Sequence, residues 1–377
     1  MTNRVENINK DILQQCRKQI GLALFEVEKR VKTIAEIEGG TKKPTFKQLD
    51  KLSALYKVPR WVFVSKQLPD KYQFDKAVPA FRQLASSNAE IFSDSKVRSL
   101  VAQVERFRDL ILELLDDMGE AIASFNPPKL SDNTKPEVGA MLIRKWLGLS
   151  EEKLDFETWK KLLEEKGIFV FMTSKYIGWS HIDKTLLRGL AIYHSTLPII
   201  IINDSDAKKA QSFTLFHELG HLLKKESAID DWEYHKRNIE NWCDKLAGNV
   251  LMPARLFQSA VSSIDNLKTV KSIARNSRVS AYACLVRLRQ LQIINKDTYE
   301  DYEVQLKDEY AELQKKLKDT SGGPSRDRPQ EVLNQYGHIY TNVLFQAYHN
   351  REIGLHKLSK LFNLKKSSYV LEMEGML

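Results

Sequence analysis

The segment His217-Glu218-Leu219-Gly220-His221 has the residue types and the spacing of a hydrolytic metal site. Two histidines four positions apart project from one face of a helix, one turn apart, so both imidazoles can reach a single tetrahedral zinc ion. Glu218 then lies beside the metal, where its carboxylate can take the proton of a zinc-bound water and return it to a leaving amine. The alternative is a solvated helix surface, because the same pattern also arises by chance.

A catalytic zinc needs a third protein ligand and an open position, so one more side chain must approach the two histidines. Glu240 is the candidate, since it follows His221 by nineteen residues and begins the acidic stretch ENWCD. Asp244 lies one helical turn after Glu240, where it can orient a ligand histidine through a hydrogen bond. For Glu240, the alternative is an exposed helix carboxylate.

Short apolar runs and one amphipathic helix must position these side chains. Strands are predicted at 167–171, 189–193 and 198–202, and helices around 140–146 and 156–166. The helix that carries the two histidines is predicted from about Asp206 to Leu223, with 203–206 as its cap and a buried stripe of Phe213, Phe216, Gly220 and Leu223.

The predicted strand at 189–193 has two interpretations. It is either a sheet edge that pairs with an extended substrate segment or an internal strand of the sheet. A proton donor should also lie near the metal, and His194, Tyr234 and His235 are candidates by residue type alone.

Three segments in order resemble the ImmA/IrrE family of metallopeptidases: RGLAIYHSTLPIIIIN at 188–203, QSFTLFHELGHLL at 211–223 and ENWCDKLAGNVLMP at 240–253. The resemblance covers roughly 135–260 well and extends weakly through 261–377. It implies zinc ligands His217, His221 and Glu240, with Glu218 as the general base. It also implies a protein substrate, because family members cleave repressors or other regulators of mobile elements and stress genes.

One position departs from the family pattern. The family's last motif usually reads alanine, alanine, glutamate before its apolar pair, whereas this chain has Ala247-Gly248-Asn249. The zinc ligand set is unaffected, but we expect weaker local helix packing, because glycine destabilises a helix interior by about 1 kcal/mol relative to alanine.

The N-terminal residues 10–66 resemble an Xre-type helix-turn-helix and supply most of the positive charge. Residues 1–70 contain 14 Lys and Arg against 8 Asp and Glu, which gives +6 of the total +9. Double-stranded DNA is therefore one expected partner, but the helix at 32–38 carries two glutamates that phosphates would repel. Recognition of a protein partner and a purely structural role are the alternatives. The arginine-rich segment 272–294 is interpreted as core-packing helices rather than a second DNA-binding module.

The composition limits the class of protein. The chain is 42% hydrophobic and 28% charged, which is typical of a globular protein with a sizeable core. The longest apolar run, 197–202, falls far short of the roughly 20 residues that span a bilayer, so we expect no membrane association. The first residues resemble no export signal, and three cysteines fit no disulfide framework, so we expect a cytoplasmic protein.

Together these observations predict an α+β fold that is mostly helical. It combines a zincin-like metallopeptidase domain, built from a small sheet and the HExxH helix, with an N-terminal helix-turn-helix-like bundle. The predicted divisions are a helix-turn-helix-like domain at 1–70, a helical connector at 71–130, the metallopeptidase domain at 131–260, a helical region at 261–318, a linker at 319–329 and a small helical piece at 330–377.

The predicted function is a zinc-dependent endopeptidase that cleaves a regulatory protein, such as a repressor, an antitoxin-like protein or a stress regulator. Two alternatives remain from the sequence. One is a non-catalytic DNA- or protein-binding regulator or antitoxin that retains a zincin-like fold. The other is a metal hydrolase acting on a non-peptide bond, because the HExxH pattern specifies the chemistry of the water and not the substrate.

Overall fold

The computed structural model describes residues 4–73, 94–122, 124–131, 133–150, 152–173, 182–224, 232–255, 264–318 and 327–376. The chain divides into two compact units, Met1–Leu112 with Trp179–Ile182 and Glu113–Gly178 with Asp183–Leu377. Helix α8, Ser95–Asp117, extends across the division. Within the described residues, no helix is long and apolar enough to cross a membrane.

The N-terminal unit contains short helices around a small apolar core. They are α1 Lys10–Gln19, α2 Leu24–Glu28, α3 Ile34–Glu38, α4 Phe46–Tyr56 and the 3-10 helices η1 Arg60–Val64 and η2 Asp70–Tyr72. Asn9 caps α1, and Thr45 and Gln48 form a capping box at the start of α4, so polar residues at the turns determine where these helices begin. The resemblance to a helix-turn-helix stays a prediction.

The two glutamates of the segment 32–38 have different environments. Glu38 is buried, its carboxylate accepts hydrogen bonds from the Arg17 guanidinium, and the Tyr56 hydroxyl lies 3.4 Å from Glu38 Oε1. Glu36 is exposed and pairs with Lys42 at 2.9 Å. The expectation that both glutamates would face phosphates is therefore wrong for Glu38, because Arg17 holds its charge inside the core.

The second unit contains a three-stranded sheet of order β1-β3-β2. Strand β1, Phe169–Thr173, is parallel to β3, Ile199–Asn203, and β2, Gly189–Ile192, is antiparallel to β3. Strand β2 is thus an edge of the sheet among the described residues. Strand β1 starts later than the predicted 167–171, because Gly167 has a φ of 78° and forms the turn that follows the preceding helix.

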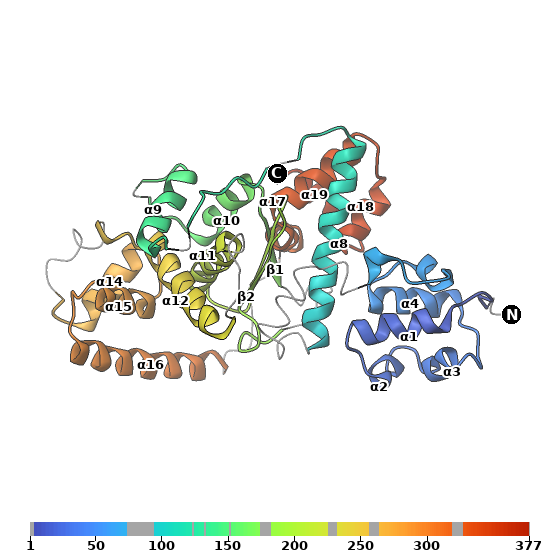
Figure 1. Cartoon of the computed structure of the whole chain (residues 1–377), viewed down its shortest axis with the longest axis horizontal. Coiled ribbons are helices and arrows are strands. Elements are labelled where there is room, and N and C mark those ends of the chain that lie inside the picture. Colours follow the sequence, from blue (N-terminus) through green and yellow to red (C-terminus); the bar gives the residue numbers. More distant parts are fainter. Residues whose placement is uncertain are drawn as a thin grey trace. The chain divides into compact units, whose positions relative to one another are not determined.

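Two helices, α10 Phe156–Glu165 and α11 Lys208–Lys224, pack on one face of the sheet (Figure 1). Helix α12 Trp232–Leu251 packs on α11, and α9 Pro136–Trp146 packs on α12; α11 and α12 carry the predicted site. Helix α11 begins after the predicted Asp206, because Asn203 Oδ1 accepts the Ser205 N–H and holds a turn there. The predicted apolar stripe of α11 is buried, except for Phe213, which is half-buried. Leu215, Leu219 and Leu222 lie outside this stripe and are buried as well, because both the sheet and α12 cover the helix.

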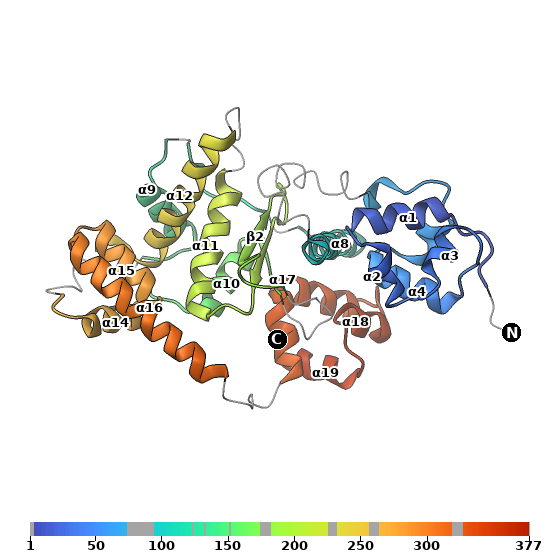
Figure 2. The ribbon, with the colours of Figure 1, turned by 90° about the horizontal axis from the view of Figure 1, so that it is seen from below.

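Three C-terminal helices follow, of which the first packs along β1 on the other face of the sheet and the other two pack on the first (Figure 2). They are α17 Arg328–His349, α18 Leu355–Leu361 and α19 Ser368–Glu374, and the Phe171 ring contacts Tyr340 of α17. Most of the predicted linker, 319–326, lies outside the described residues. Residues 327–376 therefore contribute directly to the core around the sheet.

The remaining helices are α14 Leu267–Asn276, α15 Ala281–Gln290 and α16 Lys296–Lys318. Arg287 of α15 is buried, and it donates to the Met252 carbonyl at 3.1 Å and to Asn249 Oδ1 at 2.6 Å. This pairing agrees with the core-packing interpretation of 272–294. Helix α12 continues past Gly248 to Leu251, and Arg287 contacts it at Asn249; the expected weak packing at Ala247-Gly248-Asn249 stays a prediction.

Candidate metal centre

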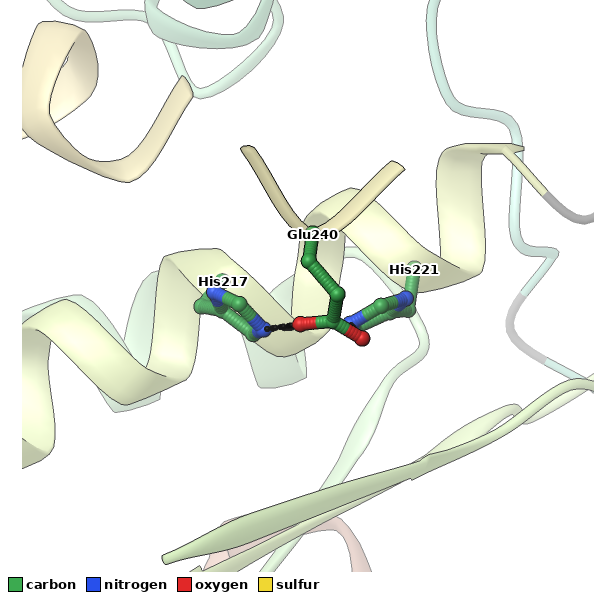
Figure 3. Close-up of side chains that lie close together, drawn as sticks. All are labelled: His217, His221 and Glu240. Atoms are coloured by element: carbon green, nitrogen blue, oxygen red, sulfur yellow. Dashed lines mark hydrogen bonds and ion pairs between the residues drawn. The ribbon is translucent and has the colours of Figure 1, made fainter. Parts of the chain in front are cut away.

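Helices α11 and α12 bring three potential ligands to one point (Figure 3). His217 and His221 project from the same face of α11, and their Nε2 atoms lie 3.1 Å apart. Glu240 reaches them from α12, with Oε2 3.1 Å from His217 Nε2 and Oε1 3.5 Å from His221 Nε2. The two helices lie side by side, so residues distant in the sequence meet at the predicted site.

The separation of these donor atoms fits a tetrahedral zinc ion. Zinc binds imidazole nitrogen and carboxylate oxygen at about 2.0–2.2 Å, which places neighbouring donors of a tetrahedron roughly 3.3–3.6 Å apart. The observed separations of 3.1–3.5 Å agree with that value to within a few tenths of an ångström. Two imidazoles and one carboxylate are also the donor types of a catalytic zinc site with an open position.

Two adjacent residues of α12, Cys243 and Asp244, contact the side chains of the two histidines. The Nδ1 atom of His217 lies 2.8 Å from Asp244 Oδ1, so an Nδ1–H can donate to the carboxylate and leave the Nε2 lone pair for a metal. A hydrogen bond also joins the His221 side chain to the Cys243 thiol. Sequence reasoning identified Asp244 but not Cys243, although Cys243 follows Glu240 by one helical turn and could have been considered.

The metal-free site favours protonated histidines. Burial lowers the pKa of His217, but hydrogen bonds with Asp244 and Glu240 outweigh this effect and raise it to about 10. Burial also lowers the pKa of His221, whereas hydrogen bonds with Cys243 and Glu240 raise it well above its ordinary value. The same hydrogen bonds hold the pKa of Glu240 far below its usual range. The three shifts share one cause, the hydrogen bonds that join the histidines to Glu240.

Glu218 lies between the two histidines in sequence but contacts a different element. Its side chain is buried, and its carboxylate accepts a hydrogen bond from the Ala191 backbone N–H on β2. Burial raises the pKa of Glu218, an effect that the two histidines and the Ala191 hydrogen bond partly offset. A buried carboxylate with a raised pKa beside a metal site has the properties of a general base and acid.

Residues 164–289 match the family model of the IrrE N-terminal-like domain, Peptidase_M78. This match supports the ImmA/IrrE resemblance for that region and suggests a metallopeptidase; peptidases of this family are in general zinc-dependent. The matched region contains β1–β3, α11, α12 and all the residues of the candidate centre. A search of curated proteins found no match to the chain.

His194, one of the candidate proton donors, is half-buried just after β2. The side chains of the other two candidates, Tyr234 and His235, lie outside the described residues, so the proton-donor role stays a prediction. The helices α1–α4 and α17–α19 lie outside the matched region.

Proposed function

We propose that this chain is a zinc-dependent endopeptidase that cleaves a regulatory protein, such as a repressor, an antitoxin-like protein or a stress regulator. The observation that carries the proposal is the convergence of His217, His221 and Glu240 beside the buried carboxylate of Glu218. The family match supports the peptidase activity, and the resemblance to ImmA/IrrE proteins supports a regulator as the substrate.

Each residue of the centre has a proposed role. His217, His221 and Glu240 hold the metal, and Asp244 keeps the His217 imidazole oriented. A zinc ion bound there supplies Lewis-acid polarisation of the peptide carbonyl and lowers the pKa of water. Glu218 takes a proton from the attacking water on its carboxylate and delivers it to the leaving amine. Its raised pKa suits both halves of this transfer, because the carboxylate must gain and then lose the proton.

Strand β2 is the proposed docking edge for the substrate backbone. It pairs with β3 on one side only among the described strands, and it contacts Glu218 through Ala191. An extended peptide added along this edge would pass directly beside the proposed base. Of the two interpretations of the strand at 189–193, the edge position favours substrate pairing.

The N-terminal unit supports a second candidate activity, binding of double-stranded DNA or of a protein partner through residues 10–66. The burial of Glu38 against Arg17 removes one of the two negative charges expected to oppose phosphates. Phe25 and Phe46 are exposed on this unit, which also suits contact with a protein. Duplex affinity that falls steeply with salt would support DNA, and salt-independent binding of a regulator would support protein recognition.

We also propose a cytoplasmic location. Cys16, Cys243 and Cys284 are all buried and free, which agrees with a reducing compartment.

The test of the peptidase proposal compares two proteins on the same substrates. Zinc-loaded wild-type chain and Glu218→Gln are incubated with a lysate and with purified products of neighbouring genes, and new protein N-termini are identified by mass spectrometry. The proposal expects at least one regulator cut by the wild type and not by Glu218→Gln. Equal cleavage by both proteins would overturn it.

A further inference from the structure

On the face of the sheet that contacts α11, the side chains become smaller toward β2. The strand register aligns Met172, Ile202 and Gly189 in one row across the sheet. The neighbouring row contains Val170, Ile200 and Ala191. In both rows the side chain on β2 is the smallest, so α11 can approach the backbone of the edge strand more closely than the rest of the sheet.

The closest approach is at Gly189. A Cβ atom at this position would lie 2.5 Å from Thr214 Cγ2, 2.7 Å from Glu218 Oε1 and 2.9 Å from Glu218 Cγ. Carbon atoms in good contact are about 3.5–4.0 Å apart, so any side chain here would overlap both residues. The φ of Gly189 is not positive, so the space, and not the backbone conformation, requires glycine.

The contact involves the proposed base itself. Gly189 lies two residues before Ala191, whose backbone N–H donates to the Glu218 carboxylate. The small residue at 189 lets the Glu218 side chain lie along the strand and reach this N–H. On α11 itself, Gly220 lies against α12: a Cβ atom there would lie 2.8 Å from Cys243 Sγ, so the helix is also closely packed on this side.

We propose that Gly189 is a positioning residue: its missing side chain creates the space in which the Glu218 carboxylate is held on the Ala191 N–H, next to the proposed docking edge. This inference rests on the proposed peptidase function. The three atoms nearest to a methyl group at 189 belong to Thr214 and Glu218 and not to the metal ligands, so we expect the carboxylate to be displaced. Misplacement of a catalytic group by about 1 Å can cost about 100-fold in rate, which is the expected loss of kcat in Gly189→Ala.

Thr214 allows the effect on Glu218 to be separated from a general clash. Thr214 Cγ2 is attached to a short, stiff side chain, whereas the Glu218 carboxylate is the end of a flexible one. In the double variant Gly189→Ala/Thr214→Ser the methyl group of Thr214 is gone, and the remaining overlap is with Glu218. Thr214→Ser alone is the first control. Gly248→Ala is the second, since a Cβ there meets nothing within 4 Å.

The experiment measures the Ala191 amide proton by NMR in the metal-free full chain labelled with 15N-alanine. Glu218→Ala should shift this signal strongly in the wild-type background, because the hydrogen bond is lost. In the Gly189→Ala/Thr214→Ser background the same substitution should leave the signal unchanged, because the carboxylate has already moved. Zinc content and melting temperature of the double variant should equal those of Thr214→Ser, and kcat on an identified substrate should fall about 100-fold with KM unchanged.

Equal shifts of the Ala191 signal in the two backgrounds would overturn the proposal. A double variant that loses zinc or fails to fold would also overturn it, since Gly189 would then serve the packing of the whole helix. If the wild type cleaves no protein, the proposed function fails, but the NMR comparison still decides whether Gly189 positions Glu218.

Discussion

Two polar clusters of the second unit, one buried and one partly exposed, differ in how their charges are balanced. On α10, Lys160 and Glu164 lie one turn apart; Lys160 Nζ donates to the Asn334 carbonyl, and Glu164 Oε1 accepts the His338 N–H at 3.0 Å. One cation and one anion thus hold the two sides of a break in α17 at Gly337, where φ is 75°. Burial raises the pKa of Glu164 to about 7 and lowers the pKa of Lys160, and the attraction between the two groups opposes both shifts.

The cluster around His217 has no such balance. Two imidazoles face each other at 3.1 Å, and three carboxylates, those of Glu218, Glu240 and Asp244, contact or interact with them. With neutral imidazoles these carboxylates have no positive partner among the residues just named, so the site favours a cation, either as protons on the histidines or as a divalent metal. The comparison separates a cluster that contains its own lysine from one that favours a bound cation.

The largest expected effect is on catalysis. Glu218→Gln keeps the shape of the side chain but removes its ability to accept a proton, so the cleavage rate should fall about 10²–10⁴-fold. Zinc content should stay at the wild-type level, because Glu218 is not among the three converging ligands. Turnover of the substrate and metal analysis on the same sample check this prediction; a Glu218→Gln protein with undiminished turnover would contradict the assigned base.

The next effect is on stability and concerns the balanced cluster. Lys160→Met removes the donor to the Asn334 carbonyl and the cation that attracts the buried Glu164 carboxylate, and should lower the free energy of unfolding by about 1–3 kcal/mol. Lys160→Met/Glu164→Leu should recover only part of that loss, since it removes the charge of Glu164 but also leaves the His338 N–H without its acceptor. Urea denaturation measures both variants. A single variant as stable as the wild type would show that the pair contributes nothing.

A smaller effect is expected from the hydrogen bond between Asp244 and His217. Asp244→Asn weakens the acceptor for His217 Nδ1 and should reduce zinc affinity about 10–100-fold while the metal-free protein stays folded. Asp308→Asn, an exposed aspartate on α16, is the matched control. Competition with a chelator of known affinity measures both; equal affinities for the two variants would contradict the orienting role of Asp244.

The smallest expected effect is the dependence of zinc affinity on pH. The pKa of His217 is about 10 in the metal-free chain, so the imidazole carries a proton at neutral pH that must leave before Nε2 binds zinc. Affinity should therefore rise as pH rises and fall as pH falls, by about tenfold per pH unit for each proton released. Chelator competition between about pH 6 and about pH 9 gives the slope. A flat profile would contradict protonated histidines.

Sequence reasoning identified the residues that meet in this centre because their spacing along helices determines their geometry. His217 and His221 share a helix face, and Asp244 follows Glu240 by one turn, so each pair is local in the chain. The approach of Glu240 to the histidines depends on how α11 packs on α12; its place in the acidic stretch after His221 made it the candidate ligand, and the resemblance to a family implied the contact.

Other features depend on contacts between distant elements and could not be predicted in the same way. The space at Gly189 exists only because Thr214 and Glu218 of α11 lie over β2. Glu38 is buried and paired with Arg17, so it does not add to the negative charge that the N-terminal helices present to phosphates. The spacing of apolar residues did not indicate this pairing. The contribution of α17 to the sheet core was likewise not indicated, because its sequence reads as an independent helical piece.

The most direct test of the central claim is the zinc content of the purified chain, measured by mass spectrometry for the wild type, Glu240→Ala and Glu218→Gln after exposure to zinc. The account predicts about one zinc per wild-type chain, a large loss in Glu240→Ala and full retention in Glu218→Gln. A wild-type chain without zinc, or a Glu240→Ala chain that keeps all of it, would contradict the metal centre formed by His217, His221 and Glu240.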